Sequence, residues 1–248
     1  MTPAHPPKVA IVTGGASGIG AAIAERLARD GLTVVAADLN AETTTLPNAA
    51  GVHPYRLDVT DVAAVDDLIS AVQHSHGRLE CVVHSAGIGR VAPFLDTSLE
   101  LFDLVVKTNL YGTFVIGKAA AQAMASSGGG VIVNIGSVSG LRGNAGRAAY
   151  GASKGAIITL SQVMAVELAD RGVRVNVIAP GPIETPLATA QHSDAVREAW
   201  ATNTPMRRYG HPRDIAAAAA YLCSDDAAFV TGSVLVVDGG FAAGGILA

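Results

Sequence analysis

The chain has 248 residues, half of them hydrophobic, and a formal net charge of −4. This length suits one domain with a large core, and the acidic balance excludes a surface specialised for nucleic acid or anionic membranes, which would need basic patches. Two cysteines make a disulfide framework implausible, and the absence of a Cys/His cluster leaves no zinc or other metal signature.

Predicted strands and helices alternate along the chain. Strands are predicted near residues 8–13, 32–37, 52–57, 80–84, 130–136, 173–179 and 233–237. Helices are predicted near 18–30, 61–76, 98–126, 148–170, 188–200 and 211–223, with a short piece near 40–46. Such alternation indicates an α/β fold in which a doubly wound sheet of about seven parallel strands is flanked by helices on both faces.

The N-terminal segment of the chain and its hydropathy favour a cytoplasmic protein. Residues 1–7 include three prolines and no apolar stretch, so we expect a flexible N-terminal arm rather than a signal peptide. No run reaches the ~18 uncharged apolar residues that a membrane span needs, so no membrane association is expected.

The first predicted strand runs into a glycine-rich turn, Thr13-Gly14-Gly15-Ala16-Ser17-Gly18-Ile19-Gly20, followed by a helix. Gly14, Gly18 and Gly20 allow the backbone to turn tightly and to approach a pyrophosphate, which the free N–H groups of the helix would bind. A glycine-rich turn alone is weak evidence, but here it lies between a strand and a helix, as a dinucleotide site requires. Its spacing is Gly-x-x-x-Gly-x-Gly.

Asp38 follows the second predicted strand and points to NAD rather than NADP. A carboxylate at this strand end can accept hydrogen bonds from both ribose hydroxyls of an adenosine, and it would repel a 2′-phosphate. Neither Arg nor Lys stands at Ser17, Leu39 or Asn40 to receive such a phosphate. The alternative interpretation is an Asp that caps a turn or helix.

Tyr150 and Lys154 lie four residues apart, with Ser137 thirteen residues upstream of Tyr150. Because few breakers interrupt residues 148–170, the pair would share one helix face. A lysine ammonium nearby would favour the phenolate, and a phenol with a lowered pKa can serve as general base or acid. The alternative is a surface pair at helical spacing.

These segments together resemble the short-chain dehydrogenase/reductase family, from about Lys8 to Gly240. The resemblance rests on motifs in order: Gly14, Gly18 and Gly20, Leu57-Asp58-Val59, Ala86-Gly87, Asn109, Ser137, Tyr150 with Lys154, and Pro180-Gly181. The family commonly has Asn-Asn-Ala-Gly after the fourth strand, whereas this chain has His84-Ser85-Ala86-Gly87. That difference puts the local bracing of the sheet in doubt more than the chemistry.

The resemblance implies a Rossmann-type fold, with residues 1–248 forming one dinucleotide-binding catalytic domain. It implies that Tyr150 exchanges the proton, Lys154 lowers the Tyr150 pKa and holds the nicotinamide ribose, and Ser137 binds the substrate oxygen. Asn109 would hold a water that links Lys154 to solvent. The expected cofactor contacts are Gly14, Ser17, Gly18, Ile19, Gly20, Asp38, Leu39, Asp58, Val59, Ala86, Gly87, Tyr150, Lys154, Pro180, Gly181, Ile183 and Thr185.

The motif residues all follow predicted parallel strands, and ligands of such sheets bind beyond the carboxyl ends of the strands. A largely apolar lid favours uncharged, moderately hydrophobic substrates over phosphorylated sugars. The expected substrate pocket comprises Ser139, Asn144, Leu187, Ala188, Trp200 and Met206. For Trp200, a place in the core is an equal alternative.

Several polar residues are assigned structural or surface roles. Arg142 and Arg147 flank the loop before Tyr150, and we expect a salt bridge or an interface rather than contact with an anionic substrate. His84 is expected to be structural. Surface positions are expected for His53, His74, His76, His192 and His211.

The leading function is an NAD-dependent oxidoreductase that interconverts a small, mostly uncharged secondary alcohol and its ketone. Alternatives within the enzyme class are a 3-oxoacyl-carrier-protein reductase and a polyol or sugar dehydrogenase. A dinucleotide-binding regulator on the same fold is the non-enzyme alternative, because fold does not fix function. An apolar C-terminus and small residues on the helices near 98–126 and 148–170 favour a homo-oligomer, and the resemblance implies a homotetramer.

Overall fold

The structure is a computed structural model that describes residues 8–41, 50–76 and 78–244. The predicted arm over 1–7, most of the short piece near 40–46 and the last four residues of the apolar C-terminus lie outside the described residues. Within the described part, no helix is both long and apolar enough to cross a membrane.

Seven parallel strands form one sheet in the order β3-β2-β1-β4-β5-β6-β7, which confirms the predicted fold. The strand order reverses between β1 and β4, where ligands of doubly wound sheets bind. The strands are β1 (Val9–Thr13), β2 (Thr33–Asp38), β3 (Val52–Arg56), β4 (Leu79–His84), β5 (Gly130–Ile135), β6 (Val173–Pro180) and β7 (Val234–Val237).

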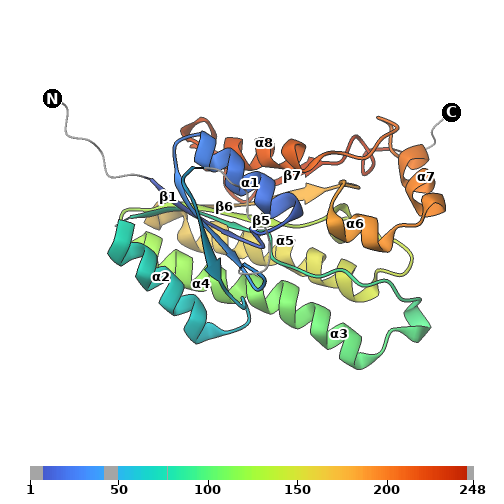
Figure 1. Cartoon of the computed structure of the whole chain (residues 1–248), viewed down its shortest axis with the longest axis horizontal. Helices are drawn as coiled ribbons and strands as arrows, with labels where there is room; N and C mark the ends of the chain where they lie inside the picture. Colours follow the sequence, from blue (N-terminus) through green and yellow to red (C-terminus); the bar gives the residue numbers. More distant parts are fainter. Residues whose placement is uncertain (1–7, 42–49, 77, 245–248) are drawn as a thin grey trace.

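Helices cover both faces of the sheet (Figure 1). On one face, α1 (Gly18–Arg29) and α8 (Pro212–Cys223) pack on a core that includes Ile23, Val83 and Ile215. On the other face lie α2 (Val62–His76), α4 (Gly112–Ser126) and α5 (Ala148–Leu168). Because both faces are covered, the central strands are continuous apolar runs, as in β1, whose five residues are all buried.

Two predicted helices are divided in the structure. The run near 98–126 consists of α3 (Leu99–Val106), a π-helical turn over Lys107–Tyr111, and α4. The run near 188–200 consists of α6 (Pro186–Gln191) and α7 (Asp194–Asn203), which begins anew because the Ser193 hydroxyl accepts from the backbone N–H of Val196 at 3.5 Å.

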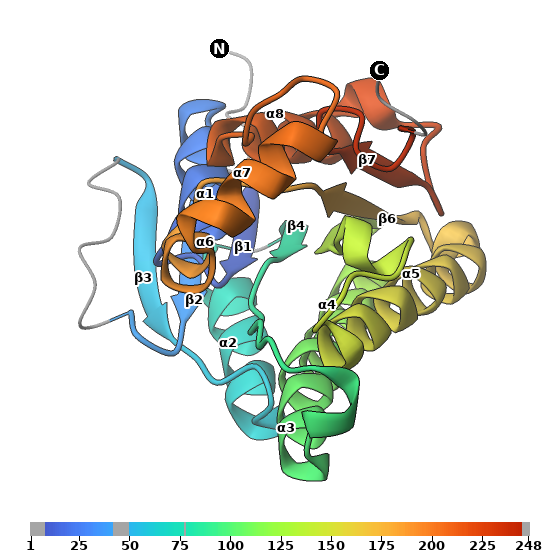
Figure 2. The same cartoon turned by 90° about the vertical axis from the view of Figure 1, so that its right-hand side faces the viewer.

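The shorter helices lie at one end of the molecule. Figure 2 looks onto this end, where α6 and α7 lie on the side of α1 and α8. Short 3₁₀ turns are also present, at Phe94–Asp96, Val138–Gly140, Ala169–Arg171 and Asp225–Ala227.

Thr13 braces the sheet where the chain departs from the family motif. Its hydroxyl oxygen lies 2.7 Å from Nδ1 of His84 and accepts from the Ala86 N–H at 3.3 Å. The backbone N–H of Ser85 donates to the Thr13 carbonyl at 3.1 Å. β1 and β4 are therefore joined without the usual asparagines. His84 is buried, and burial together with the charge of Lys154 lowers its pKa to about 3, so it is a neutral structural residue.

Both cysteines are free thiols and lie against each other. The sulfur atoms of Cys81, in β4, and Cys223, at the end of α8, are 2.8 Å apart. This contact and burial raise the pKa of Cys81, so its thiol stays protonated and packs as a small apolar group.

Candidate active site

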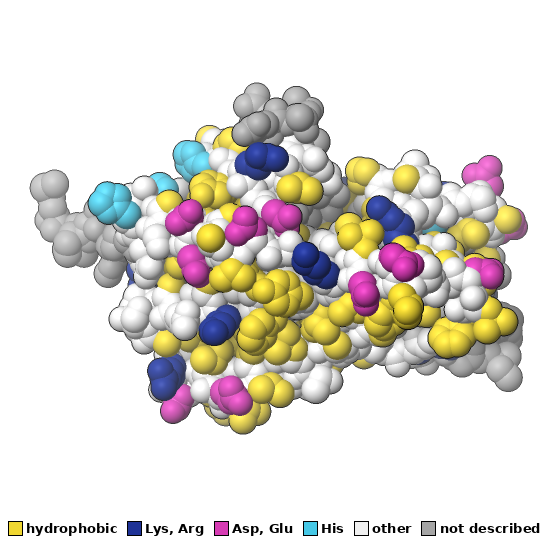
Figure 3. Space-filling model, turned by 90° about the horizontal axis from the view of Figure 1, so that it is seen from below, with side chains coloured by type: hydrophobic (Ala, Val, Ile, Leu, Met, Phe, Trp, Pro, Cys, Tyr) yellow, Lys and Arg dark blue, Asp and Glu magenta, His cyan; other side chains and the backbone are white. Residues whose placement is uncertain are grey.

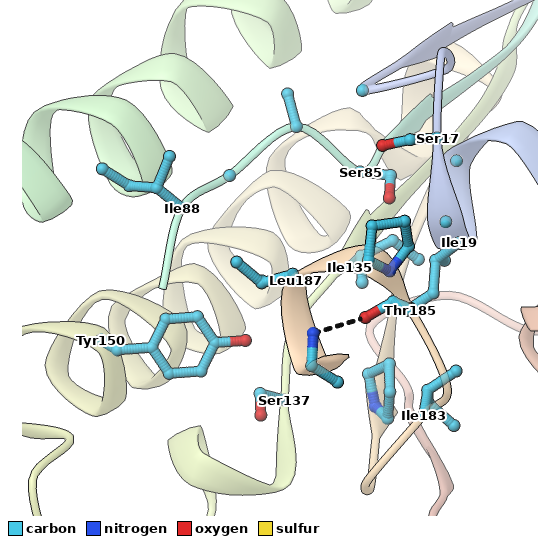
Figure 4. Close-up of a pocket in the computed structure, with 18 of the residues that line it drawn as sticks. Ser17, Ile19, Ser85, Ile88, Ile135, Ser137, Tyr150, Ile183, Thr185 and Leu187 are labelled. Atoms are coloured by element: carbon cyan, nitrogen blue, oxygen red, sulfur yellow. Dashed lines mark hydrogen bonds between the residues drawn. The ribbon is translucent and has the colours of Figure 1, made fainter. Parts of the chain in front are cut away.

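A cavity of about 430 Å³ lies beyond the carboxyl ends of the strands. Every residue predicted to contact the cofactor lines this cavity, from the glycine turn after β1 to Thr185 before α6. The sticks in Figure 4 show that Tyr150 and Ser137 lie to one side of it, while Ser17 and Ile19 lie to the other. The segments that the sequence motifs occupy therefore meet around one space.

The turn after β1 has a backbone path that requires glycine. Gly14 and Gly18 have φ of +66° and +54°, which residues with a side chain rarely adopt. A Cβ at Gly20 would lie 2.1 Å from the Gly14 carbonyl oxygen, and one at Gly14 would lie 2.8 Å from the backbone nitrogen of Ala86. The turn thus brings the N-terminus of α1 to the cavity wall, where its N–H groups fit a pyrophosphate.

Asp38 ends β2 and lines the cavity on that side. Its carboxylate accepts from the backbone N–H groups of Ala16 at 3.2 Å and Asn40 at 2.9 Å, which fix its position. Among the cavity-lining residues in the described part of the chain, Arg147 and Lys154 are the only Arg and Lys. Both lie on or beside α5, whereas Asp38 ends β2.

Asp58 and Val59 line the cavity after β3. The Asp58 carboxylate accepts from the backbone N–H of Thr60 at 2.9 Å and from its hydroxyl at 2.8 Å. These bonds hold the turn that presents Val59 to the cavity. A Cβ at Gly112 would lie 2.7 Å from the Val59 side chain, so a larger residue at position 112 would clash with Val59.

Tyr150 and Ser137 face the cavity together. Ser137 follows β5, and its hydroxyl accepts from the Ser139 N–H at 3.1 Å, while Tyr150 lies in the first turn of α5 and directs its hydroxyl into the same space (Figure 4). Burial raises the pKa of Tyr150, although the Ser137 hydroxyl and the Arg147 charge act in the opposite direction. The prediction of a lowered tyrosine pKa is therefore wrong for the protein without cofactor, because spacing gives the neighbouring charge but not the desolvation.

Lys154 is buried beneath Tyr150. Its ammonium donates to the Ile135 carbonyl at 2.7 Å and lies 5.7 Å from the centre of the Tyr150 ring. Burial lowers the pKa of Lys154 to about 8, so the group is charged at neutral pH yet poorly solvated. A polar group of a bound ligand that accepts a hydrogen bond from the Lys154 ammonium would replace part of the hydration that this ammonium loses on burial.

Asn109 does not line the cavity, unlike the other predicted catalytic residues. It lies on the π-helical turn and is fully buried. Its amide oxygen accepts from the Ile88 N–H at 2.8 Å, and its amide nitrogen donates to the Ile88 carbonyl at 3.0 Å and to the Ser153 hydroxyl at 3.1 Å. Asn109 therefore holds the segment after β4 against α5, and its role with a water stays a prediction.

Four of the six residues predicted for the substrate pocket line the cavity, and the pocket itself stays a prediction. These four are Ser139, Leu187, Ala188 and Trp200, so Trp200 lies at the cavity wall. Asn144 and Met206 do not line it. Asn144 instead donates to the Ser139 hydroxyl at 3.0 Å, and Met206 is 59% exposed in the loop after α7.

Sequence reasoning missed the role of Arg147, Gln191 and His192. The guanidinium of Arg147 donates to the Gln191 amide oxygen at 3.2 Å and to Nε2 of His192 at 3.1 Å, and all three residues line the cavity. His192, expected at the surface, is partly buried, and the centre of its ring lies 6.4 Å from that of Trp200 and 6.1 Å from that of Tyr209. No local pattern signals this group, because its partners lie more than 40 residues apart in sequence.

Arg142, His53 and His211 do not line the cavity. Arg142 donates to the Phe241 carbonyl at 3.3 Å and stacks on that ring, so it neither lines the cavity nor forms an ion pair within the described residues. His53 is exposed, and His211 precedes α8 as its N-cap residue.

Residues 14–242 match the family model described as enoyl-(acyl carrier protein) reductase. A 3-oxoacyl-[acyl-carrier-protein] reductase of Thermotoga maritima is 38% identical over 239 residues, which cover 94% of this chain and 97% of that protein. The chain belongs to the short-chain dehydrogenase/reductase family. This membership confirms the resemblance seen in the motifs and makes the protein an oxidoreductase of a family that binds nicotinamide dinucleotides.

Other members of the short-chain dehydrogenase/reductase family are equally similar in sequence but differ in substrate. A D-threitol dehydrogenase of Mycolicibacterium smegmatis is 41% identical over 240 residues, covering 94% of this chain and 92% of that protein. The crystal structure of levodione reductase superposes with a TM-score of 0.89 at 34% identity, covering 95% of this chain and 98% of that one. Membership of the family therefore gives the class of reaction but not the substrate, which has to be inferred from the residues that line the cavity of this chain.

Proposed function

We propose that the protein is an NAD(H)-dependent alcohol dehydrogenase or carbonyl reductase that interconverts a small secondary alcohol and its ketone. The observation that carries this proposal is the meeting of Tyr150 and Ser137 with the glycine turn around one cavity. Dinucleotide binding alone would not require a tyrosine and a serine side chain at the wall of the same cavity.

We assign each residue of the site a separate role in the proposed reaction. Bound NAD(H) supplies the hydride chemistry. Ser137 donates a hydrogen bond to the substrate oxygen and stabilises its developing charge, and Tyr150 takes or returns the proton of that oxygen. Lys154 adds positive charge beneath the phenol, 5.7 Å from the ring centre, and binds the nicotinamide ribose. Asn109 keeps the wall formed by Ile88 in place.

NAD is proposed over NADP because of Asp38. The carboxylate is already fixed by two backbone N–H groups, so it is positioned to accept from ribose hydroxyls without further ordering. A 2′-phosphate would meet this charge with no Arg or Lys of the cavity wall on the same side. The segment 42–49, which lies outside the described residues, also has no Arg or Lys in its sequence.

Two alternative enzyme functions come from the relatives. A 3-oxoacyl-carrier-protein reductase would need a basic surface for its acidic carrier, whereas this chain has a net charge of −4. A polyol dehydrogenase would need several polar groups for the extra hydroxyls, whereas Ile88, Leu187 and Trp200 make much of the wall apolar. These observations favour a largely apolar substrate body over both polyols and phosphorylated sugars.

We also propose a homotetramer in the cytoplasm. The face formed by α2, α3, α4 and α5 carries a band of hydrophobic side chains (Figure 3). Exposed hydrophobic residues on these helices include Phe102, Phe114, Val163 and Val166. An apolar surface of this kind favours burial against another copy of the chain.

The test of the reaction is a spectrophotometric assay of NADH with a panel of secondary alcohols and ketones. Tyr150→Phe should lower turnover by at least ~10²-fold while NAD binding, measured by calorimetry, stays near wild type. Tyr221→Phe is the matched control, because this tyrosine is exposed on α8 and does not line the cavity. Turnover near wild type in Tyr150→Phe would refute the proton-transfer role.

A further inference from the structure

Arg147 places a positive charge on the cavity wall, and no acidic side chain of the described residues forms an ion pair with it. The described residues form five ion pairs, and none of them includes Arg147. The side chain is partly buried, and its hydrogen-bond partners are the neutral groups of Gln191 and His192. A partly buried charge without a counter-ion is costly to keep, and it gains from an anionic ligand.

The local network keeps His192 neutral, so its ring adds no second positive charge beside Arg147. A guanidinium can only donate, so Nε2 of His192 accepts from Arg147 and the ring proton lies on Nδ1, which donates to the Tyr209 hydroxyl at 3.0 Å. Burial, together with the charges of Arg147 and Arg197, lowers the pKa of His192. The nearby carboxylate of Glu184 forms its ion pair with Arg197 instead.

The guanidinium is held firmly in this position. Gln191 accepts from Arg147 and donates to the Gly89 carbonyl at 2.7 Å, which ties α6 to the segment after β4. A Cβ at Gly89 would lie 3.3 Å from Nη1 of Arg147, so the backbone there packs closely against the guanidinium. Two of the five N–H groups of Arg147 are used by Gln191 and His192, which leaves donors for a further ligand.

The charge also lies close to the reacting group. The central guanidinium carbon is 5.5 Å from the centre of the Tyr150 ring, and the Arg147 charge favours the phenolate of Tyr150. An anionic group bound by Arg147 would therefore lie only a few bonds from a substrate oxygen at Tyr150. Planar guanidinium groups bind carboxylates through paired hydrogen bonds.

We propose that Arg147 binds the carboxylate of a short hydroxy or oxo carboxylic acid whose alcohol or ketone faces Tyr150. Gln191 and His192 act as positioning residues for the guanidinium. This inference rests on the proposed function and names its substrate class. It also modifies the expectation of an uncharged substrate, since the apolar wall at Leu187 and Trp200 receives the body of the molecule and Arg147 receives one charge at its end.

The test compares each acid with its own methyl ester, using 3- and 4-hydroxy carboxylic acids of acyclic and cyclohexane type with NAD. Wild type should prefer the acid of its best pair by ~10- to 100-fold in kcat/KM, the range for hydrogen bonds to a charged group. Arg147→Gln should remove this preference by lowering kcat/KM for the acid alone, and Arg147→Lys should restore part of it. Because Arg147 also affects the Tyr150 pKa, the ratio of acid to ester is the quantity to compare.

Arg142→Gln is the matched control, since Arg142 flanks the same loop but does not line the cavity, and it should keep the wild-type ratio. Equal losses for acid and ester in Arg147→Gln would show a purely structural role and overturn the proposal. A raised KM for NAD in Arg147→Gln, with an unchanged ratio of acid to ester, would also overturn the proposal, because Arg147 would then contact the cofactor.

A binding measurement separates failure of the subsite from failure of the proposed reaction. With NAD present, cyclohexanecarboxylate should raise the thermal midpoint of wild type more than cyclohexanecarboxamide does, and Arg147→Gln should abolish the difference. If no alcohol is oxidised but the acid still raises the thermal midpoint more than the amide, the proposed reaction is refuted and the proposed anion subsite is supported. Equal shifts with acid and amide in wild type would overturn the subsite.

Discussion

Replacing Lys154 by methionine should stabilise the cofactor-free protein at neutral pH. Lys154 is 5% exposed, and burial lowers its pKa from 10.5 to about 8. At about 1.36 kcal/mol per pH unit, holding the ammonium charged costs the folded state roughly 3 kcal/mol. Methionine removes the charge and fills similar space, but it loses the bond to the Ile135 carbonyl. We therefore expect the free energy of unfolding to rise by about 1–3 kcal/mol near pH 7.

The gain should depend on pH in a defined direction. Below pH 8, Lys154 is protonated in both the folded and the unfolded protein, so the full cost is present. Between pH 8 and 10.5 the folded state loses the proton while the unfolded state keeps it, and the cost falls to zero. The stability difference between Lys154→Met and wild type should therefore shrink over this window. His84, whose pKa is about 3, stays neutral throughout and adds nothing to the difference.

Urea unfolding followed by circular dichroism, at fixed protein concentration from pH 6 to 10.5, measures this effect. Lys118→Met is the matched control, because Lys118 is exposed on α4. A less stable Lys154→Met protein at pH 7, or a difference that is constant across the pH range, would refute the desolvation argument. Turnover should be lost in the same variant, which would show that the buried charge is kept for function at the expense of stability.

The remaining predictions concern the cofactor and the assembly. Asp38→Ala combined with Leu39→Arg should shift the ratio of kcat/KM for NAD over NADP toward NADP by at least ~10²-fold, because the repelling charge is replaced by an attracting one. Equal use of both cofactors by wild type would show that Asp38 does not discriminate. Light scattering at micromolar concentration should give a tetramer, and Val166→Glu, at a site that is 81% exposed on α5, should reduce the assembly. A wild-type mass near the 25.0 kDa of one chain would contradict the tetramer.

The sheet and the cofactor side of the cavity were predictable because both depend on local patterns. Strands buried on both faces are short apolar runs, and the turn after β1 needs glycine at defined positions. In a parallel sheet the residues that follow neighbouring strands must lie at one edge. Gly14, Asp38 and Ser137 could therefore be placed together without knowledge of any side-chain contact, and all three line the cavity.

The interruptions in the helices were not predictable in the same way. Residues 98–126 have an uninterrupted helical pattern, and the π-helical turn within them is fixed by tertiary bonds from Asn109 to Ile88 and Ser153. The pKa of Tyr150 was misjudged for a related reason. Its charged neighbours follow from spacing along α5, whereas its desolvation depends on segments that close over it from other parts of the chain.

Two of the charges that line the cavity, those of Asp38 and Arg147, would discriminate between ligands by sign in the proposed function. Asp38 ends β2 on the glycine-turn side, and Arg147 lies beside Tyr150 on the other. At short range in a partly desolvated site, each charge favours a ligand group of opposite sign and opposes one of the same sign. In the proposed function, Asp38 would oppose a phosphate on the cofactor ribose, and Arg147 would attract a carboxylate on the substrate. Removing either charge should relax selectivity at its own end and leave the other end unchanged, since the two lie on different elements without a shared partner.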